Sequence, residues 1–77
     1  RQKMKFTSKQ IGEFVKRARK ELGITQKYLA LTSGTGLRFI IDLEKGKPTC
    51  QLEKVLIVIH TLGIKIDLSL PPKNIKN

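Results

Sequence analysis

Glycines at intervals divide the apolar pattern of this 77-residue chain into short segments of helical period. Ahead of each of Gly23, Gly34, Gly46 and Gly63, apolar residues recur three and four positions apart, the spacing of one helix face. Glycine ends a helix readily because it adopts a left-handed conformation without steric cost. The pattern therefore predicts an all-α domain of four short helices.

Polar residues that can cap a helix precede most of these segments. The expected helices span residues 8–22, 26–32, 36–45 and 50–62, with caps from Thr7 or Ser8, from Thr25 and from Thr49. The expected inner face of the first helix consists of Ile11, Phe14, Val15, Ala18 and Leu22. That of the fourth consists of Leu52, Val55, Leu56, Ile59 and Leu62, with Val58 at its margin.

After Gly63 the apolar period changes from helical to two. Ile64, Ile66, Leu68 and Leu70 alternate with polar residues until Pro71-Pro72, as in a half-buried β-strand. No second alternating segment exists to pair with it, so we expect the strand to pair across a homodimer. Ile57 points away from the inner face of the fourth helix and is expected to join that interface, although a single exposed isoleucine also needs no partner.

These patterns divide the chain into four parts. We expect a basic N-terminal arm at 1–7, a helical domain at 8–63, a dimerisation strand at 64–70 and a disordered tail at 71–77.

The charge is strongly unbalanced. The chain has 16 Lys and Arg against 6 Asp and Glu, a formal net charge of +10. Such an excess generates a positive potential that favours polyanions. Nucleic acid is the first candidate partner and an anionic membrane surface the second, with a role in solubility alone as the remaining interpretation.

The number of cysteines and the length of the apolar runs indicate in which cellular compartment the protein is expected. Cys50 is the single cysteine, which excludes an internal disulfide. The longest apolar run, residues 55–59, is far too short to span a bilayer. We therefore expect a cytoplasmic protein without membrane insertion.

Residues 23–46 hold the most informative pattern, two short helices joined by a turn that contains glycine. This is the arrangement of a helix-turn-helix. Ala30 is small enough to let the two helices approach where they cross, and Gly34 is expected to adopt a positive φ in the turn.

The same stretch resembles the Xre family, the lambda-repressor-like helix-turn-helix proteins, over residues 11–63. The family pattern is met by Thr25-Gln26, Leu29-Ala30, Gly34, Ile40 and Leu43-Glu44-Lys45-Gly46. Residues 38–49 and the Leu-Gly-Ile sequence that follows the fourth helix look most like HipB-type antitoxins. The resemblance implies a DNA-binding repressor and, in its narrower form, a HipA-like kinase toxin as partner.

Arg38 and Asp42 lie one turn apart on the outer side of the third helix. A guanidinium can bind guanine O6 and N7 with two hydrogen bonds, so Arg38 is the main candidate for base recognition. A phosphate contact by Arg38 is an equally good interpretation. Asp42 is expected either to orient Arg38 or to accept a hydrogen bond from a cytosine amine.

The other expected contacts surround the starts of the second and third helices. Gln26 lies in a first helical turn, where free backbone amides can hold a phosphate, unless it merely completes the cap. Gly36 stands where the family commonly has a Ser or Thr cap, so that hydroxyl is missing here. The full expected DNA-binding set is Thr25, Gln26, Lys27, Thr35, Gly36, Leu37, Arg38, Asp42, Lys45 and Lys47.

Glu44 falls on the inner side of the third helix. A buried carboxylate is costly without a cation, and Arg19, at the edge of the first helix's apolar face, is the expected partner. The family resemblance implies the same ion pair. We assign the pair a structural role.

No catalytic pattern is recognisable. His60 and Cys50 are the only candidates for soft metal ligands, and two ligands do not close a zinc site. We therefore expect no enzyme activity, no metal and no cofactor.

The preferred hypothesis is a dimeric, sequence-specific repressor of a pseudo-palindromic operator in double-stranded DNA, acting as the antitoxin of a HipA-like toxin. A second hypothesis is a protein-interaction module that neutralises a toxin with little DNA role. A third is a phage-type repressor or restriction-system controller without a toxin partner.

Overall fold

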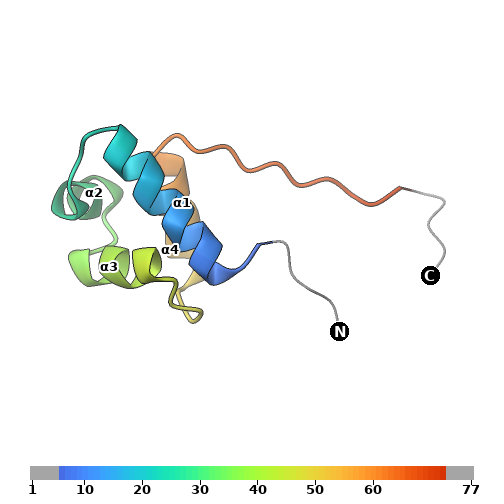
Figure 1. Cartoon of the computed structure of the whole chain (residues 1–77), viewed down its shortest axis with the longest axis horizontal. Coiled ribbons are helices and arrows are strands. Elements are labelled where there is room, and N and C mark those ends of the chain that lie inside the picture. The colour runs from blue at the N-terminus through green and yellow to red at the C-terminus, as the bar shows by residue number, and fades with distance from the viewer. Residues whose placement is uncertain (1–5, 73–77) are drawn as a thin grey trace.

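The computed structural model describes residues 6–72. It contains four helices, α1 (Ser8–Glu21), α2 (Gln26–Ser33), α3 (Leu37–Lys45) and α4 (Leu52–Thr61), which confirms the expected all-helical domain (Figure 1). Most of the expected basic arm, and the end of the expected disordered tail, lie outside the described residues.

Local sequence explains where the first three helices begin and end. Thr7 forms a capping box with Gln10, in which each side chain bonds the other's backbone amide at 3.1–3.2 Å. Thr25 caps α2, and Gly34 and Gly46 end α2 and α3 in the left-handed conformation.

The fourth helix begins later than expected. Residues 48–49 form a turn, and Gln51 is the N-cap of α4, without a side-chain hydrogen bond. The prediction that Thr49 caps a helix from Cys50 is therefore wrong. The cause is the turn that carries the chain away from α3 before α4 begins.

Each helix contributes one fully buried side chain to the core, namely Val15, Leu29, Ile40 and Val58. Burial of an aliphatic side chain contributes roughly 1.5–3 kcal/mol relative to exposure, so these four fix how the helices pack. α3 packs against both α1 and α2, and α4 packs against α2.

Two expected inner faces are partly wrong. Phe14 and Leu22 on α1 are 52% and 57% exposed. On α4, Leu52 and Leu56 are exposed whereas Val58, expected at the margin, is completely buried. The buried stripe of α4 is thus rotated toward Val58, because α4 presents only part of its apolar surface to the other helices.

The C-terminal segment is extended and leaves the helical body (Figure 1). Ile64 packs against the core, and its amide bonds the Ile59 carbonyl at 3.1 Å. No strand is found within residues 6–72, so strand formation at 64–70 stays a prediction. Within the same residues, no helix is long and apolar enough to cross a membrane.

Candidate nucleic-acid interface

The turn between α2 and α3 depends on two glycines. Gly34 has φ 72° and ψ 19°, the left-handed conformation expected for it, and its amide bonds the Ala30 carbonyl at 2.9 Å. Gly36, the N-cap of α3, has φ 95° and ψ 146°, a region that is almost exclusive to glycine. A serine or threonine cap is therefore disfavoured by the backbone conformation at Gly36.

Thr35, between these glycines, is only 8% exposed. Its hydroxyl lies 2.9 Å from the hydroxyl of Ser33. Of the expected DNA contacts in the turn, Thr35 is thus the one whose hydroxyl already has a protein partner. It stabilises the turn that carries α3.

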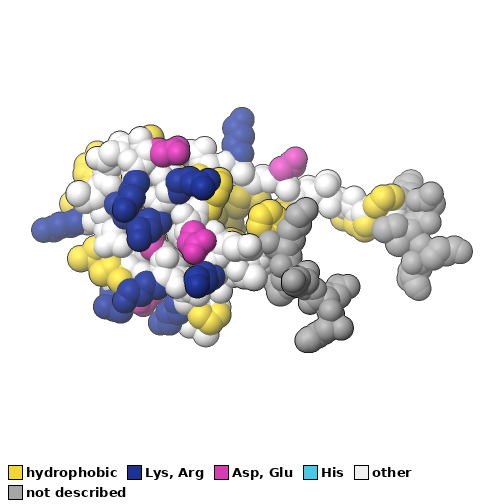
Figure 2. All heavy atoms as spheres, in the orientation of Figure 1, with side chains coloured by type: hydrophobic (Ala, Val, Ile, Leu, Met, Phe, Trp, Pro, Cys, Tyr) yellow, Lys and Arg dark blue, Asp and Glu magenta, His cyan; other side chains and the backbone are white. Residues whose placement is uncertain are grey.

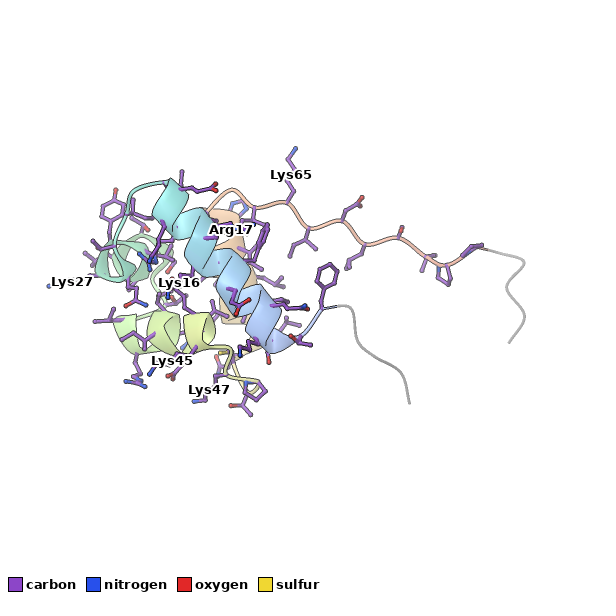
Figure 3. All side chains as sticks on the ribbon, in the orientation of Figure 1. Lys16, Arg17, Lys27, Lys45, Lys47 and Lys65 are labelled. Carbon is purple, nitrogen blue, oxygen red and sulfur yellow. The ribbon has the colours of Figure 1, made fainter. Side chains whose placement is uncertain are left out.

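The first turn of α2 presents two backbone amides without protein acceptors. Thr25 Oγ1 accepts the Tyr28 amide at 3.0 Å, and the Leu29 amide bonds the Thr25 carbonyl. Within the described residues, the amides of Gln26 and Lys27 have no acceptor. Amides at a helix N-terminus are a favourable site for a phosphate, and the exposed Lys27 side chain projects from the same turn (Figure 3).

Beneath this turn lies the ion pair expected from the sequence. Arg19 Nε and Nη2 donate to the two carboxylate oxygens of Glu44 at 2.6 and 3.1 Å, and the two side chains are 9% and 3% exposed. Arg19 Nη1 donates to the Ile24 carbonyl at 2.9 Å. These hydrogen bonds satisfy the two buried charges, as burial requires.

The side chain of Gln26 points toward this pair. Its Nε2 donates to Glu44 Oε1 at 3.0 Å, and the residue is half-buried. The sequence pattern did not predict this contact, because Gln26 and Glu44 are 18 positions apart. This hydrogen bond uses one of the two side-chain amide hydrogens of Gln26. The other hydrogen and the side-chain oxygen take no part in it.

On the outer face of α3, Arg38 Nη2 lies 2.9 Å from Asp42 Oδ1. The Arg38 side chain is 74% exposed, and Lys47 Nζ approaches Asp42 Oδ2 at 3.5 Å. The hydrogen bond from Arg38, together with the charges of Arg38 and Lys47, lowers the pKa of Asp42. Asp42 is therefore an anion that holds one edge of the guanidinium and leaves its other donors free.

Further basic residues surround this face. Lys45 and Lys47 are exposed at the end of α3, and Leu37 is 42% exposed at its start. Figure 3 shows Lys45 on α3, Lys47 in the loop that follows α3 and Lys27 projecting from α2, whereas Lys16 and Arg17 lie on α1. Figure 2 shows Lys and Arg side chains scattered over the face of the helical body that is turned to the viewer. An arginine held by an acid, with lysines and free helix amides beside it, is suited to bind a polyanion.

The residues expected at a dimer interface lie apart from this face. Ile57, Ile66, Leu68 and Leu70 are 39%, 51%, 89% and 91% exposed, while Ile64 is half-buried. Their apolar surface lies mainly on the C-terminal segment.

Two features were missed or left open by sequence reasoning. Gly12 is buried where α1 crosses α3, and a Cβ there would overlap the carbonyl oxygen of Leu43. A glycine in the middle of an amphipathic helix was the available signal. Phe39 on α3, which the apolar pattern did not place, packs against the core, with Lys54 Nζ of α4 5.8 Å from its ring centroid.

The described residues contain no group of three or more His, Cys, Asp or Glu placed to hold a metal ion. Cys50 is half-buried, and burial raises the pKa of its thiol, which keeps it protonated at neutral pH.

Comparison with known proteins gives a consistent result. The helix-turn-helix family HTH_3 matches residues 15–69. The chain is 52% identical over 65 residues to the HTH-type transcriptional regulator y4mF of Sinorhizobium fredii. The aligned residues make up 84% of this chain and 86% of that protein. It is 40% identical over 60 residues to an HTH-type transcriptional regulator of Haemophilus influenzae, covering 78% of this chain and 59% of that longer protein.

Proposed function

Because the chain belongs to the Xre-like helix-turn-helix family, we propose that it is a sequence-specific transcriptional regulator that binds double-stranded DNA through α2 and α3. The observation that carries the proposal is the exposed guanidinium of Arg38 on the outer face of α3, held by Asp42 at 2.9 Å. A guanidinium fixed at one edge loses little side-chain entropy when its remaining donors bind guanine O6 and N7.

The first turn of α2 supplies the contacts that position α3. A phosphate accepts the free amides of Gln26 and Lys27, and the side chain of Lys27 adds a charge. Gln26 donates its second amide hydrogen to the same phosphate while its first remains on Glu44. Lys45 and Lys47 contact the phosphate backbone beyond the other end of α3.

The regulator acts as a homodimer whose C-terminal segments join the two copies. Two α3 helices then enter successive major grooves about 34–36 Å apart, on a pseudo-palindromic operator. Each phosphate contact releases counterions, so the logarithm of the affinity falls with the logarithm of the salt concentration, with a slope of about −0.9 per contact.

A hydroxyl-radical footprint on the DNA upstream of the gene tests this arrangement. We expect two protected patches, related by two-fold symmetry and one helical turn apart. An asymmetric footprint contradicts the dimer, and uniform protection that does not depend on sequence contradicts specific recognition.

The narrower proposal is that the protein represses its own operon as the antitoxin of a HipA-like kinase toxin. It is supported by the resemblance of residues 38–49 to HipB-type antitoxins. If the neighbouring gene encodes such a kinase, co-purification provides the test. Arg38→Ala is expected to lose operator binding and keep the kinase complex, because Arg38 lies on the DNA face; absence of any complex with the wild-type chain contradicts the antitoxin role.

A further inference from the structure

Two apolar side chains on α3 are not used by the core. Leu37, the first residue of α3, is 42% exposed. Ile41, one turn further along, is half-buried, yet the partly buried apolar side chains of residues 6–72 that pack against the core include Phe39 of α3 and not Ile41. The residues of α3 that are buried are Ile40, Leu43 and Glu44. Part of the apolar surface of α3 is therefore left over after the helices have packed.

Leu37 and Ile41 run beside the Arg38–Asp42 pair. Successive residues of an α-helix are about 100° apart around its axis, so in projection Ile41 lies about 40° from Leu37 and about 60° from Arg38. Residues four positions apart are neighbours on one face. The outer side of α3 therefore presents an apolar row, Leu37 and Ile41, next to a charged row, Arg38 and Asp42.

The start of the apolar row is open to an approaching molecule. Gly36, the N-cap that precedes Leu37, has no side chain, and a Cβ built there would meet no atom within 4 Å beyond its two chain neighbours. Positive charge flanks the row, because the Arg38 side chain is 74% exposed and Lys45 is exposed further along α3. A small apolar surface is thus embedded in a face that favours a polyanion.

The chemistry of the DNA bases identifies what fits this row. Stable protein interfaces bury about 800 Å² on each partner, far more than two side chains can offer. In the major groove, the one apolar group that the base pairs present is the 5-methyl group of thymine. A polyanion that carries such a methyl group can contact the apolar row and the charged row together.

We propose that Leu37, with Ile41 behind it, reads the 5-methyl group of a thymine in the base pair next to the guanine that Arg38 binds. The inference rests on the DNA binding proposed above for α2 and α3, and it adds a second base to the recognised sequence. Consecutive Cα atoms are about 3.8 Å apart and stacked base pairs about 3.4 Å, so consecutive side chains at the start of α3 reach adjacent base pairs.

The size of the effect follows from the burial of one methyl group. Removing a buried methyl group weakens binding about fourfold. Uracil differs from thymine only in lacking this methyl group, so uracil at the contacted position is expected to weaken binding about fourfold per half-site. The hydrogen-bonding groups of the base are the same in both.

Base interference on the DNA upstream of the gene tests the proposal before the operator is known. Duplexes with sparse uracil in place of thymine, or with guanines methylated at N7, are separated into bound and free fractions by gel shift. We expect uracil at one position per half-site to be depleted from the bound fraction. That position should lie next to a guanine whose N7 methylation also weakens binding. Uracil without effect on the wild-type protein overturns the methyl contact.

Variants assign the contact to a side chain. Leu37→Ala is expected to lose the preference for thymine over uracil and to keep the N7 effect, because Arg38 is unchanged. Leu37→Met retains an apolar side chain and should retain the preference. Leu56→Ala is the matched control, because Leu56 on α4 is 43% exposed and lies on another helix. A preference that survives in Leu37→Ala, or that Leu56→Ala removes equally, overturns the assignment to Leu37.

A defined operator duplex separates the methyl group from the rest of the base. With cytosine or 5-methylcytosine at the thymine position, the wild-type protein should bind the methylated duplex about fourfold more tightly. Leu37→Ala should bind the two duplexes equally. Equal affinities for the wild-type protein overturn the methyl contact. An N7 effect without a uracil effect contradicts only the reading by Leu37, whereas the absence of both effects contradicts the proposed function itself.

Discussion

The side-chain amide of Gln26 donates a hydrogen bond to Glu44 Oε1 at 3.0 Å, so the first turn of α2 is tied to the carboxylate of a buried ion pair. Glu44 belongs to α3, and its cation, Arg19, belongs to α1. A single carboxylate therefore connects the three helices that frame the proposed DNA face. Removing the cation that balances this carboxylate should therefore lower the free energy of unfolding of the whole domain.

The first prediction concerns Arg19→Met. It leaves Glu44 charged and buried without a cation, and truncating one partner of a buried pair typically costs about 3–5 kcal/mol. Urea denaturation should show that loss in the free energy of unfolding. The double variant Arg19→Met/Glu44→Leu should recover most of it, because no uncompensated charge remains; equal destabilisation of the single and double variants would contradict the account.

Gly36 provides the second prediction. Its φ of 95° and ψ of 146° lie in a region that only glycine adopts without strain. Gly36→Asn should therefore lower the free energy of unfolding by about 1–3 kcal/mol. Gly34→Asn is the matched control, because asparagine tolerates the left-handed conformation found there. Thermal unfolding of the two variants compares them directly. Equal melting temperatures would show that the conformation at Gly36 is not strained for other residues.

Gly12→Ala is the third change. In an exposed helix this substitution usually stabilises by up to about 1 kcal/mol. At the α1–α3 crossing the added methyl group overlaps the Leu43 carbonyl, so we expect destabilisation of about 1–3 kcal/mol. Urea denaturation of the variant and the wild type shows whether the free energy of unfolding rises or falls. A stabilised variant would mean that the helices are not in close contact.

The helix boundaries were largely predictable because their signals are local. Thr7, Thr25, Gly34 and Gly46 act within a few residues of themselves, and each fulfils its expected role in the structure. Thr49 does not cap α4, because residues 48–49 form a turn and α4 begins only after it. Gln51 is the N-cap instead.

Which side of a helix is buried was less predictable. Apolar periodicity marked Leu52 and Leu56 as inner residues of α4, yet Val58 is the completely buried one. The chain has more apolar surface than its small core can accept, so sequence period alone does not say which part remains outside. The same excess leaves Phe14 of α1 52% exposed.

The site was predictable in its parts but not in its connections. Charge complementarity one turn apart indicated the Arg38–Asp42 pair, and the cost of a buried carboxylate indicated the Arg19–Glu44 pair. The hydrogen bond from Gln26 to Glu44 depends on how α2 packs on α3, which no local pattern encodes.

Asp42 supplies a prediction about pH. The hydrogen bond from Arg38, with the charge of Lys47, lowers the pKa of Asp42 below its ordinary value of 3.8. The stabilising interaction is therefore fully present above the unfolded-chain pKa and is lost as pH falls through the lower folded value. NMR titration should show Asp42 ionised throughout the neutral range. In Arg38→Ala its pKa should rise toward the ordinary value, and an unchanged pKa would mean that Arg38 does not hold the carboxylate.

The most direct test of DNA recognition compares operator affinity for Arg38→Ala and Arg17→Ala by fluorescence anisotropy at one fixed salt concentration. Both variants remove one positive charge, but Arg17 lies on the exposed side of α1 (Figure 3), whereas Arg38 lies on the outer face of α3, with its side chain 74% exposed. We predict that Arg38→Ala loses about 1–3 kcal/mol of discrimination per half-site between operator and unrelated DNA, whereas Arg17→Ala keeps the wild-type discrimination. Equal losses in both variants, or none in Arg38→Ala, would contradict the claim that α3 reads the bases.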